Sequence, residues 1–236
     1  MSFLKAEWRK LALANYSIDP ALLSPQLPYG TELDTWNGTC YVSLVGFMFL
    51  NTRILGMKIP FHIDFEEVNL RFYVKRKEAG EWKRGVVFIK EIVPKAALTF
   101  VANTVYGENY ETMPMKHSWV SQTGSLEVDY RWKKDAQWHH FSVKAETESQ
   151  EIASGSETEF ITEHYWGYAH ISDTKSNEYE VTHPKWQAYP IKSYSVQVDF
   201  EAVYGSEFGF LSSQTPASVM LAEGSEITVE SKRVIR

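Results

Sequence analysis

The stretch FEEVNLRFYVKR, residues 65–76, alternates between two kinds of side chain. Apolar residues occupy positions 68, 70, 72 and 74, whereas positions 67, 69, 71 and 73 carry glutamate, asparagine, arginine and tyrosine. A period of two residues predicts a β-strand with one buried face. The opposite face is polar, and an acid, an amide and a guanidinium in one row fit the wall of a polar cavity as well as they fit a solvent-exposed surface. The contacts of this second face therefore bear on both the fold and the function.

Strand patterns dominate the rest of the chain. Residues 41–50 are apolar on both faces, which predicts a central strand covered on both sides. Residues 63–76 and 84–93 flank a turn with a glycine and predict a β-hairpin. Further strands are predicted at residues 110–121, 125–133, 138–147, 178–182, 187–194, 217–222 and 226–234.

Helices are predicted to be few and short. Phe3, Leu4, Trp8 and Leu11 have the spacing of one helical face and predict a helix over residues 3–14. Other helices are predicted from Asp19 to about residue 25, before Gly107, at 157–165 after a capping box, and at 198–204. Many strands with few helices predict one mainly β domain over residues 1–236, with an antiparallel sheet that is either closed or strongly curved, since closure removes exposed edges.

Composition excludes several classes of partner. The formal net charge is −6 and no run of basic residues is present, so we expect no nucleic-acid partner. The apolar stretch 41–50 is about half the length that a membrane-spanning helix needs, and the charged residues near the start do not fit a signal peptide. Cys40 is the single cysteine, which favours a reducing compartment. The sequence predicts a cytoplasmic protein without a membrane partner, and it leaves a homo-oligomer open.

Motifs for metal, phosphate and nucleophilic chemistry are absent from the sequence. His139 and His140 are adjacent in a predicted strand, so their side chains point apart and do not form a metal site. His164 falls near the end of the helix predicted at 157–165, where a cationic histidine is a favourable cap. We expect no metal and no cofactor.

Six phrases taken together resemble one known family. They are FLKAEWRKLALANY, YVSLVGFMF, FEEVNLRFYV, RGVVFIKEIVP, SETEFITEHYWGY and THPKW. Their order is similar to that in the YqjF-like family of uncharacterised proteins (domain of unknown function 2071), which is grouped with the acetoacetate-decarboxylase-like superfamily. The resemblance implies a curved antiparallel sheet that forms a cone-like barrel around an internal cavity, with a few peripheral helices.

The resemblance also bears on catalysis. Acetoacetate decarboxylase forms a Schiff base through a lysine in a Gly-x-Pro-Lys-Lys phrase. Here Gly107 matches the glycine, but Asn109 and Tyr110 stand at the positions of the proline and the reactive lysine, so the paired-lysine motif is absent. Lys116 is the only nearby lysine, and it alternates with His117, so only one of the two can face a cavity. Lys116 and Glu67 are the catalytic candidates, and the sequence does not decide whether the protein is an enzyme.

Seven residues are candidates for binding a ligand in the cavity that the resemblance implies. They are Glu67, Asn69, Arg71, Tyr110, Tyr168, His183 and Trp186. The polar row of three would line the cavity, the tyrosines would form an aromatic wall, and the His-Pro-x-Trp phrase would lie at its mouth. A structural polar network for the row, and core packing for the aromatic residues, remain open alternatives.

The sequence favours a cavity that binds a small organic molecule, with Arg71 as the anchor for a carboxylate, because a guanidinium can donate to both of its oxygens. One alternative is a lyase of the decarboxylase type, with Lys116 as the Schiff-base nucleophile and Glu67 as the proton shuttle. Another is a β-scaffold that acts through protein partners.

Overall fold

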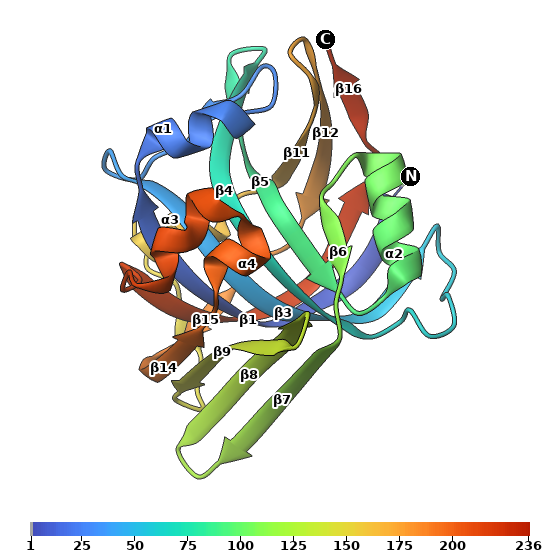
Figure 1. The fold of residues 1–236 in the computed structure, drawn as a ribbon. Helices are drawn as coiled ribbons and strands as arrows, with labels where there is room; N and C mark the ends of the chain where they lie inside the picture. Colours follow the sequence, from blue (N-terminus) through green and yellow to red (C-terminus); the bar gives the residue numbers. More distant parts are fainter. Residues whose placement is uncertain (1) are drawn as a thin grey trace.

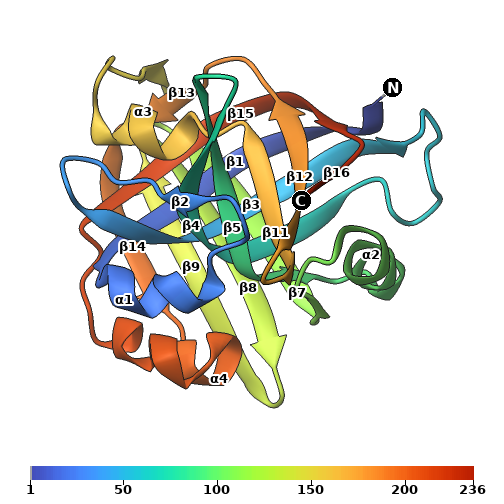
Figure 2. The ribbon, with the colours of Figure 1, turned by 90° about the horizontal axis from the view of Figure 1, so that it is seen from above.

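The computed structural model describes residues 2–236, apart from the side chains of residues 105 and 106. Strands make up most of it, in a sheet of twelve strands and a second sheet of four. Seven strands of the larger sheet follow one another as β15, β1, β3, β4, β5, β11 and β12, and β12 pairs again with β15. This last pairing closes the sheet into a ring, which Figure 2 shows from above.

The strands of the ring are β1 (Ser2–Ile18), β3 (Cys40–Ile54), β4 (Phe65–Glu78), β5 (Glu81–Val93), β11 (Trp166–Ser172), β12 (Lys175–Thr182) and β15 (Ser218–Glu230). The same sheet is extended by β2 (Glu32–Leu33), β6 (Tyr110–Thr112), β10 (Gln150–Glu151), β13 (Gln187–Tyr189) and β16 (Arg233–Ile235). Neighbours in the ring are antiparallel except β5 and β11, which are parallel over two residue pairs. The prediction of a mainly β fold with a curved, closing antiparallel sheet is confirmed.

The second sheet lies below the ring in Figure 1. Its strands are β7 (Met115–Gln122), β8 (Ser125–Lys134), β9 (Gln137–Ala145) and β14 (Ile191–Gln197). It packs against the outer faces of β1, β3 and β4 in one hydrophobic cluster, whose members include Val128 and Phe141 from the second sheet and Leu44 and Leu70 from the ring. The inward faces of the same ring strands form another cluster, which includes Val45 and Phe47. The strand at 41–50 is therefore covered on both sides, as predicted.

The helices are short and peripheral. They are α1 (Pro20–Leu23), α2 (Ala96–Val101), α3 (Glu157–Thr162) and α4 (Phe200–Tyr204), with 3₁₀ turns at Ser24–Gln26 and Ser206–Ser212 and a π turn at Ala102–Tyr106. The capping box of α3 is present, since Glu159 N–H donates to Ser156 Oγ over 3.1 Å. Gly107 ends the turn after α2 in the left-handed region, with φ 73°.

The predicted helix at residues 3–14 is wrong, because these residues belong to β1, which pairs with β15 and β3. The cause is a β-bulge at Lys10, which has φ 55°, and the register with β3 shifts between Arg9 and Ala12. Leu4 and Trp8 before the bulge and Leu11 after it consequently contact the same inward cluster. Leu4 and Trp8 are four residues apart, as two residues on one face of a strand can be, and the extra residue at the bulge places Leu11 three residues after Trp8 on the same face. Spacings of four and three residues are also those of a helical face, which explains the wrong prediction.

Other segment boundaries also differ from those predicted. The segment 110–121 is two strands in different sheets, β6 and β7, interrupted before Pro114, and 187–194 is likewise divided into β13 and β14 at Pro190. The strands predicted at 217–222 and 226–234 are largely the single strand β15. Strand β11 was not predicted, and α3 ends at Thr162 rather than at residue 165.

Candidate functional site

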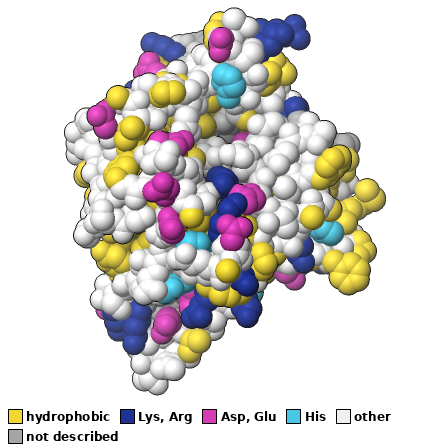
Figure 3. Space-filling model, in the orientation of Figure 1, with side chains coloured by type: hydrophobic (Ala, Val, Ile, Leu, Met, Phe, Trp, Pro, Cys, Tyr) yellow, Lys and Arg dark blue, Asp and Glu magenta, His cyan; other side chains and the backbone are white. Residues whose placement is uncertain are grey.

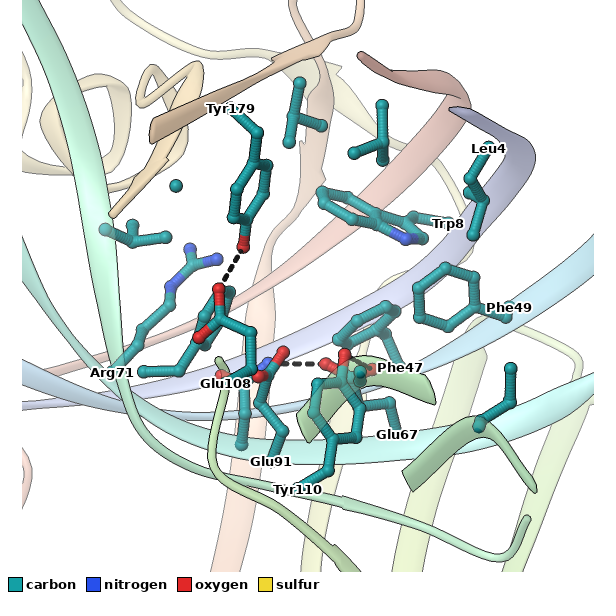
Figure 4. A pocket seen from close by; sticks show the side chains of 18 of the residues that line it. Leu4, Trp8, Phe47, Phe49, Glu67, Arg71, Glu91, Glu108, Tyr110 and Tyr179 are labelled. Carbon is teal, nitrogen blue, oxygen red and sulfur yellow. Dashed lines mark hydrogen bonds between the residues drawn. The ribbon is translucent and has the colours of Figure 1, made fainter. Parts of the chain in front are cut away.

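The polar row of β4 points into the ring. Glu67, Asn69 and Arg71 line an internal cavity of about 150 Å³, and Figure 4 shows Glu67 and Arg71 in its wall. The alternate residues of β4 belong to the cluster shared with the second sheet. All three are buried, with exposed fractions of 2%, 1% and 8%. The polar face of the opening stretch therefore contacts a cavity and not the solvent.

Most of the cavity wall is apolar. It is formed mainly by Phe3, Leu4, Trp8, Leu11, Phe47, Phe49, Ile54, Phe65, Val86, Phe88, Leu98, Val101, Trp166, Val181 and Val229. Val181 and Val229 are partners in the pairing of β12 with β15, so the contact that closes the ring also forms part of the wall. Figure 4 shows the aromatic side chains of Trp8, Phe47 and Phe49 on the side opposite Arg71 and Glu108.

Three carboxyl groups meet in the polar part of the cavity: Glu67 from β4, Glu91 from β5, and Glu108 from the segment after Gly107. Glu67 accepts hydrogen bonds from Asn69 Nδ2 over 2.9 Å and from the Tyr110 hydroxyl over 3.3 Å. Glu108 accepts one from the Tyr179 hydroxyl over 2.9 Å. Two of the three carboxyl groups thus have a tyrosine as a donor.

Burial changes the protonation of this cluster, because transfer from water to an apolar cavity disfavours a charged carboxylate. Burial raises the pKa of Glu67 to about 7, although its hydrogen bonds and the nearby Arg71 oppose the increase. It raises the pKa of Glu108 to about 8, and that of Glu91 well above its usual range with a further contribution from the charges of Glu108 and Glu67. Near neutral pH the cavity therefore holds both protonated and ionised carboxyl groups.

Arg71 is the only guanidinium in the cavity wall among the described residues. Its Nε atom is buried and has no hydrogen-bond partner, and its closest aromatic contact is the Tyr73 ring, with Cζ 5.7 Å from the centroid. The register of β4 with β5 shifts between Leu70 and Arg71. Such a bulge re-aims the side chains that follow it, and Figure 4 shows the guanidinium directed toward Glu108 and Tyr179.

The other predicted site residues lie in several places. Tyr110 lines the cavity. Tyr168 is fully buried in the outer hydrophobic cluster, and it does not line the cavity. His183 stacks on Trp186 with ring centroids 4.1 Å apart, and Trp186 borders a separate depression near α3. Of these four residues, only Tyr110 lines the same cavity as the polar row of β4. Ligand binding by all four stays a prediction.

Lys116 lies outside the cavity. It is exposed on β7 in the second sheet, with Nζ 5.1 Å from the centre of the Trp138 ring. Its neighbour His117 instead bonds Glu66 through Nδ1 at 2.7 Å. No lysine is among the described residues that line the cavity.

His164 differs from the helix cap that the sequence predicts. It follows α3, is buried beside the cavity, and its Nε2 lies 3.2 Å from Asp34 Oδ2. Burial lowers its pKa to about 4, so the imidazole is neutral at pH 7. Among the described residues, no group of three or more histidine, cysteine or acidic side chains is arranged to hold a metal ion.

Sequence reasoning missed Glu91, Glu108 and Tyr179. Glu91 had a detectable signal, since it is an acid within the apolar run of β5, opposite Asn69 in the register of β4 with β5. Glu108 and Tyr179 had no detectable signal in the sequence, because only the fold brings Glu108, in the segment after Gly107, to Tyr179 on β12.

The comparisons with known proteins agree with this architecture. The model of the DUF2071 family, described as an uncharacterized conserved protein, matches residues 5–226. The chain belongs to this family. It is 29% identical over 141 residues to the uncharacterized protein YqjF of Bacillus subtilis (strain 168), a match that spans 58% of this chain and about half, 55%, of that relative.

Similar solved structures share the fold. Acetoacetate decarboxylase of Legionella pneumophila superimposes with a TM-score of 0.66 at 13% identity, over 99% of this chain and 87% of that one. The enduracididine biosynthesis enzyme MppR, in complex with pyruvate, gives a TM-score of 0.68 at 12% identity, over 100% of this chain and 91% of that one. At such identities the likeness shows the acetoacetate-decarboxylase-like fold and nothing about activity.

Proposed function

We propose that the protein binds a small organic acid in the cavity, with Arg71 as the anchor of its carboxylate. The observation that carries the proposal is the Arg71 side chain, 8% exposed, which lines the cavity with its Nε atom unpaired. A buried guanidinium nitrogen without a partner is costly, and a bidentate carboxylate at Arg71 would satisfy it. The apolar wall opposite would hold the hydrocarbon part of the ligand.

The size of the cavity limits the ligand. About 150 Å³ is comparable to an apolar cavity that admits one benzene molecule, so we expect a ligand of roughly six to ten non-hydrogen atoms. The similar enzyme MppR has been solved with pyruvate bound, and a small acid of this kind supports the proposal by analogy of fold.

A Schiff-base lyase is less well supported. That alternative assigned the nucleophile to Lys116, which is exposed on β7, and none of the described residues in the cavity wall is a lysine. Tyr110 lies in the cavity at the position where the resemblance places the reactive lysine. We therefore propose binding, with any reaction to be carried by groups other than lysine.

We propose that the protein is located in the cytoplasm and that its partner is a small molecule and not a nucleic acid. The single cysteine, Cys40, is buried and free, and the formal net charge is −6. None of the described helices is long and apolar enough to cross a membrane.

The scaffold alternative would need an exposed apolar surface. Hydrophobic side chains gather at the right edge of Figure 3, over the loop that joins β3 to β4. Leu55, Met57 and Phe61 are exposed in this loop. Nothing in the described part of the structure identifies a partner for them.

The proposal is tested by calorimetric titration of the full chain at pH 7 with 4-methylpentanoate and with its uncharged amide. We expect the acid to bind and the amide to bind at least tenfold more weakly. Arg71→Gln is expected to remove the difference in affinity between the acid and the amide. Arg71→Lys should retain part of this difference, because an ammonium keeps the positive charge but lacks the two parallel donors of the guanidinium.

Arg131→Gln is the matched control, since Arg131 is exposed on β8 and bonds Asp129 away from the cavity. Equal affinity for acid and amide, or an Arg71→Gln variant that binds as the unchanged protein does, would overturn the proposal.

A further inference from the structure

Acidic groups outnumber basic ones among the described residues that line the cavity. Three glutamates, Glu67, Glu91 and Glu108, face the single guanidinium of Arg71, and His164 is neutral. An organic acid bound at Arg71 would compensate the guanidinium and leave the carboxyl groups without a partner charge. Buried carboxylates are stable only when they are protonated or paired with a cation.

The unpaired atoms in the cavity are of two kinds. Arg71 Nε is a buried donor without a partner, whereas Asn69 Oδ1 and Glu91 Oε2 are buried oxygens without one, and both accept hydrogen bonds when Glu91 is ionised. Asn69 and Glu91 are direct partners in the antiparallel pairing of β4 with β5, so their side chains lie beside each other on one face. A ligand that satisfies all three atoms must both accept from Arg71 and donate to the Asn69–Glu91 pair.

The surrounding groups are suited to a nitrogen cation. Donors from Asn69, Tyr110 and Tyr179 stabilise the ionised forms of Glu67 and Glu108. Aromatic side chains from β1 and β3 line the same cavity (Figure 4), and the face of an aromatic ring attracts a cation. An inorganic metal ion does not fit, since no cluster of ligating side chains is arranged for one in the described part of the chain.

From these contacts we infer that the ligand is a small zwitterion, with a carboxylate held by Arg71 and an ammonium or similar nitrogen cation held between Asn69 and Glu91, on an apolar body. The inference rests on the proposed function and adds the second charged group. Amino acids with an apolar side chain and small amines with a carboxyl group belong to this class, and their size agrees with a cavity of about 150 Å³.

A zwitterion and a simple acid differ in the sign of their proton linkage. A cation beside the carboxyl groups lowers their pKa values, so a zwitterion displaces protons into solution and binds more tightly as pH rises from 6 to 8. An acid without a cation is repelled by ionised glutamates, so it takes up protons and binds more weakly over the same range.

The experiment uses matched ligands with one carbon skeleton in common: L-leucine with both charges, 4-methylpentanoate with the carboxylate only, and 3-methylbutylamine with the ammonium only. A second series uses L-valine, 3-methylbutanoate and 2-methylpropylamine. Each is titrated calorimetrically into the full chain at pH 7 in phosphate and in Tris, which differ in heat of ionisation and so report the protons released.

We expect the zwitterion of at least one series to bind tenfold or more tightly than both single-charge analogues, with release of about one proton per ligand. Glu91→Gln should remove this preference and the proton release while leaving the affinity for the simple acid unchanged or higher. Glu66→Gln is the matched control, because Glu66 is adjacent in β4 but bonds His117 outside the cavity.

The other possible outcomes contradict either the inference alone or the inference together with the proposed function. If a simple acid binds as tightly as the zwitterion and takes up protons, the inference is overturned and the proposed function stands. If only the amines bind, or if no member of either series binds at millimolar concentration, both fail. Circular dichroism of each variant verifies folding, and an Asn69→Ala variant, which removes the other oxygen that holds the cation, serves in place of Glu91→Gln if the latter does not fold.

Discussion

Glu66 and Glu67 are consecutive and chemically identical, yet the structure gives them opposite properties. Glu67 lies in the cavity and burial raises its pKa to about 7. Glu66 points to the other face of β4. Burial raises its pKa, but the hydrogen bond with His117, a backbone hydrogen bond and the charges of His117 and Lys95 together outweigh this, and the pKa is lowered. The face of the strand on which a carboxyl group lies therefore decides its protonation at neutral pH.

The Tyr110 hydroxyl contributes to this difference, since it donates to Glu67 and stabilises the ionised carboxylate. Tyr110→Phe should therefore raise the pKa of Glu67 above about 7, by a fraction of a unit to one unit for a single lost hydrogen bond. Infrared difference spectra of the carboxyl C=O band, recorded against pH, measure the change. Tyr194→Phe, at an exposed position on β14, is the control, and an unchanged Glu67 titration in Tyr110→Phe would refute the assignment.

Among the elements, β1 shows how a bulge places side chains. Gly224 on β15 lies opposite Arg9, has φ 81°, and a Cβ there would come within 2.0 Å of the Trp8 carbonyl oxygen. Only glycine fits beside the bulge at this point. The bulge lets Trp8 and Leu11 both line the cavity from one strand.

Deletion of Lys10 tests this role of the bulge. Removing one residue turns Leu11 and Leu13 away from the inward cluster, so we expect the variant to be unfolded or insoluble. Lys10→Gly keeps the residue count and adopts the positive φ without strain, so it should remain folded with only a small loss from the contacts of Lys10 with Tyr189 and Glu223. Chemical denaturation of both variants gives the comparison; a stably folded deletion variant would show that the bulge is dispensable.

At the scale of the whole molecule, buried titratable groups set the dependence of stability on pH. The pKa values of Glu67 and Glu108 in the folded protein, about 7 and about 8, lie above the ordinary 4.5, so the folded state binds more protons in this range. Their contribution to stability is present below pH 4.5 and is lost as pH rises through 7 to 8. His164 acts in the opposite sense, because its pKa of about 4 lies below 6.5 and its contribution is lost as pH falls from 6.5 towards 4.

We therefore expect these groups to give maximal stability near pH 4.5, because above it the two glutamates outweigh the single histidine, with a decline of up to about 1.4 kcal/mol per pH unit for each net proton released. Urea denaturation at pH 5, 6, 7, 8 and 9 measures the curve. Glu108→Gln should flatten the alkaline decline, and Glu66→Gln should leave it as it is in the unchanged protein. A stability that rises between pH 7 and 9 would contradict the burial of these carboxyl groups in protonated form.

The amino-acid sequence by itself determined the strands whose alternation is uninterrupted. The pattern of β4 predicted both its faces, the apolar residues 41–50 predicted a strand covered on both sides, and the Ser156–Glu159 box predicted the start of α3. The family-wide resemblance added the closed sheet and the cavity, and the polar row Glu67, Asn69 and Arg71 lines that cavity. These features depend on local periodicity and capping, which a single stretch of chain contains.

Only the tertiary structure decided the rest. The bulge in β1 is defined by its pairing with β3 and β15, so the local pattern resembled a helix. Glu91 and Glu108 join Glu67 because β5 pairs with β4 and because the turn at Gly107 brings the following residues to Tyr179 on β12. Burial of these three carboxyl groups in one cavity, which raises their pKa values, depends on the closure of β12 onto β15, a contact between residues about fifty positions apart in the chain.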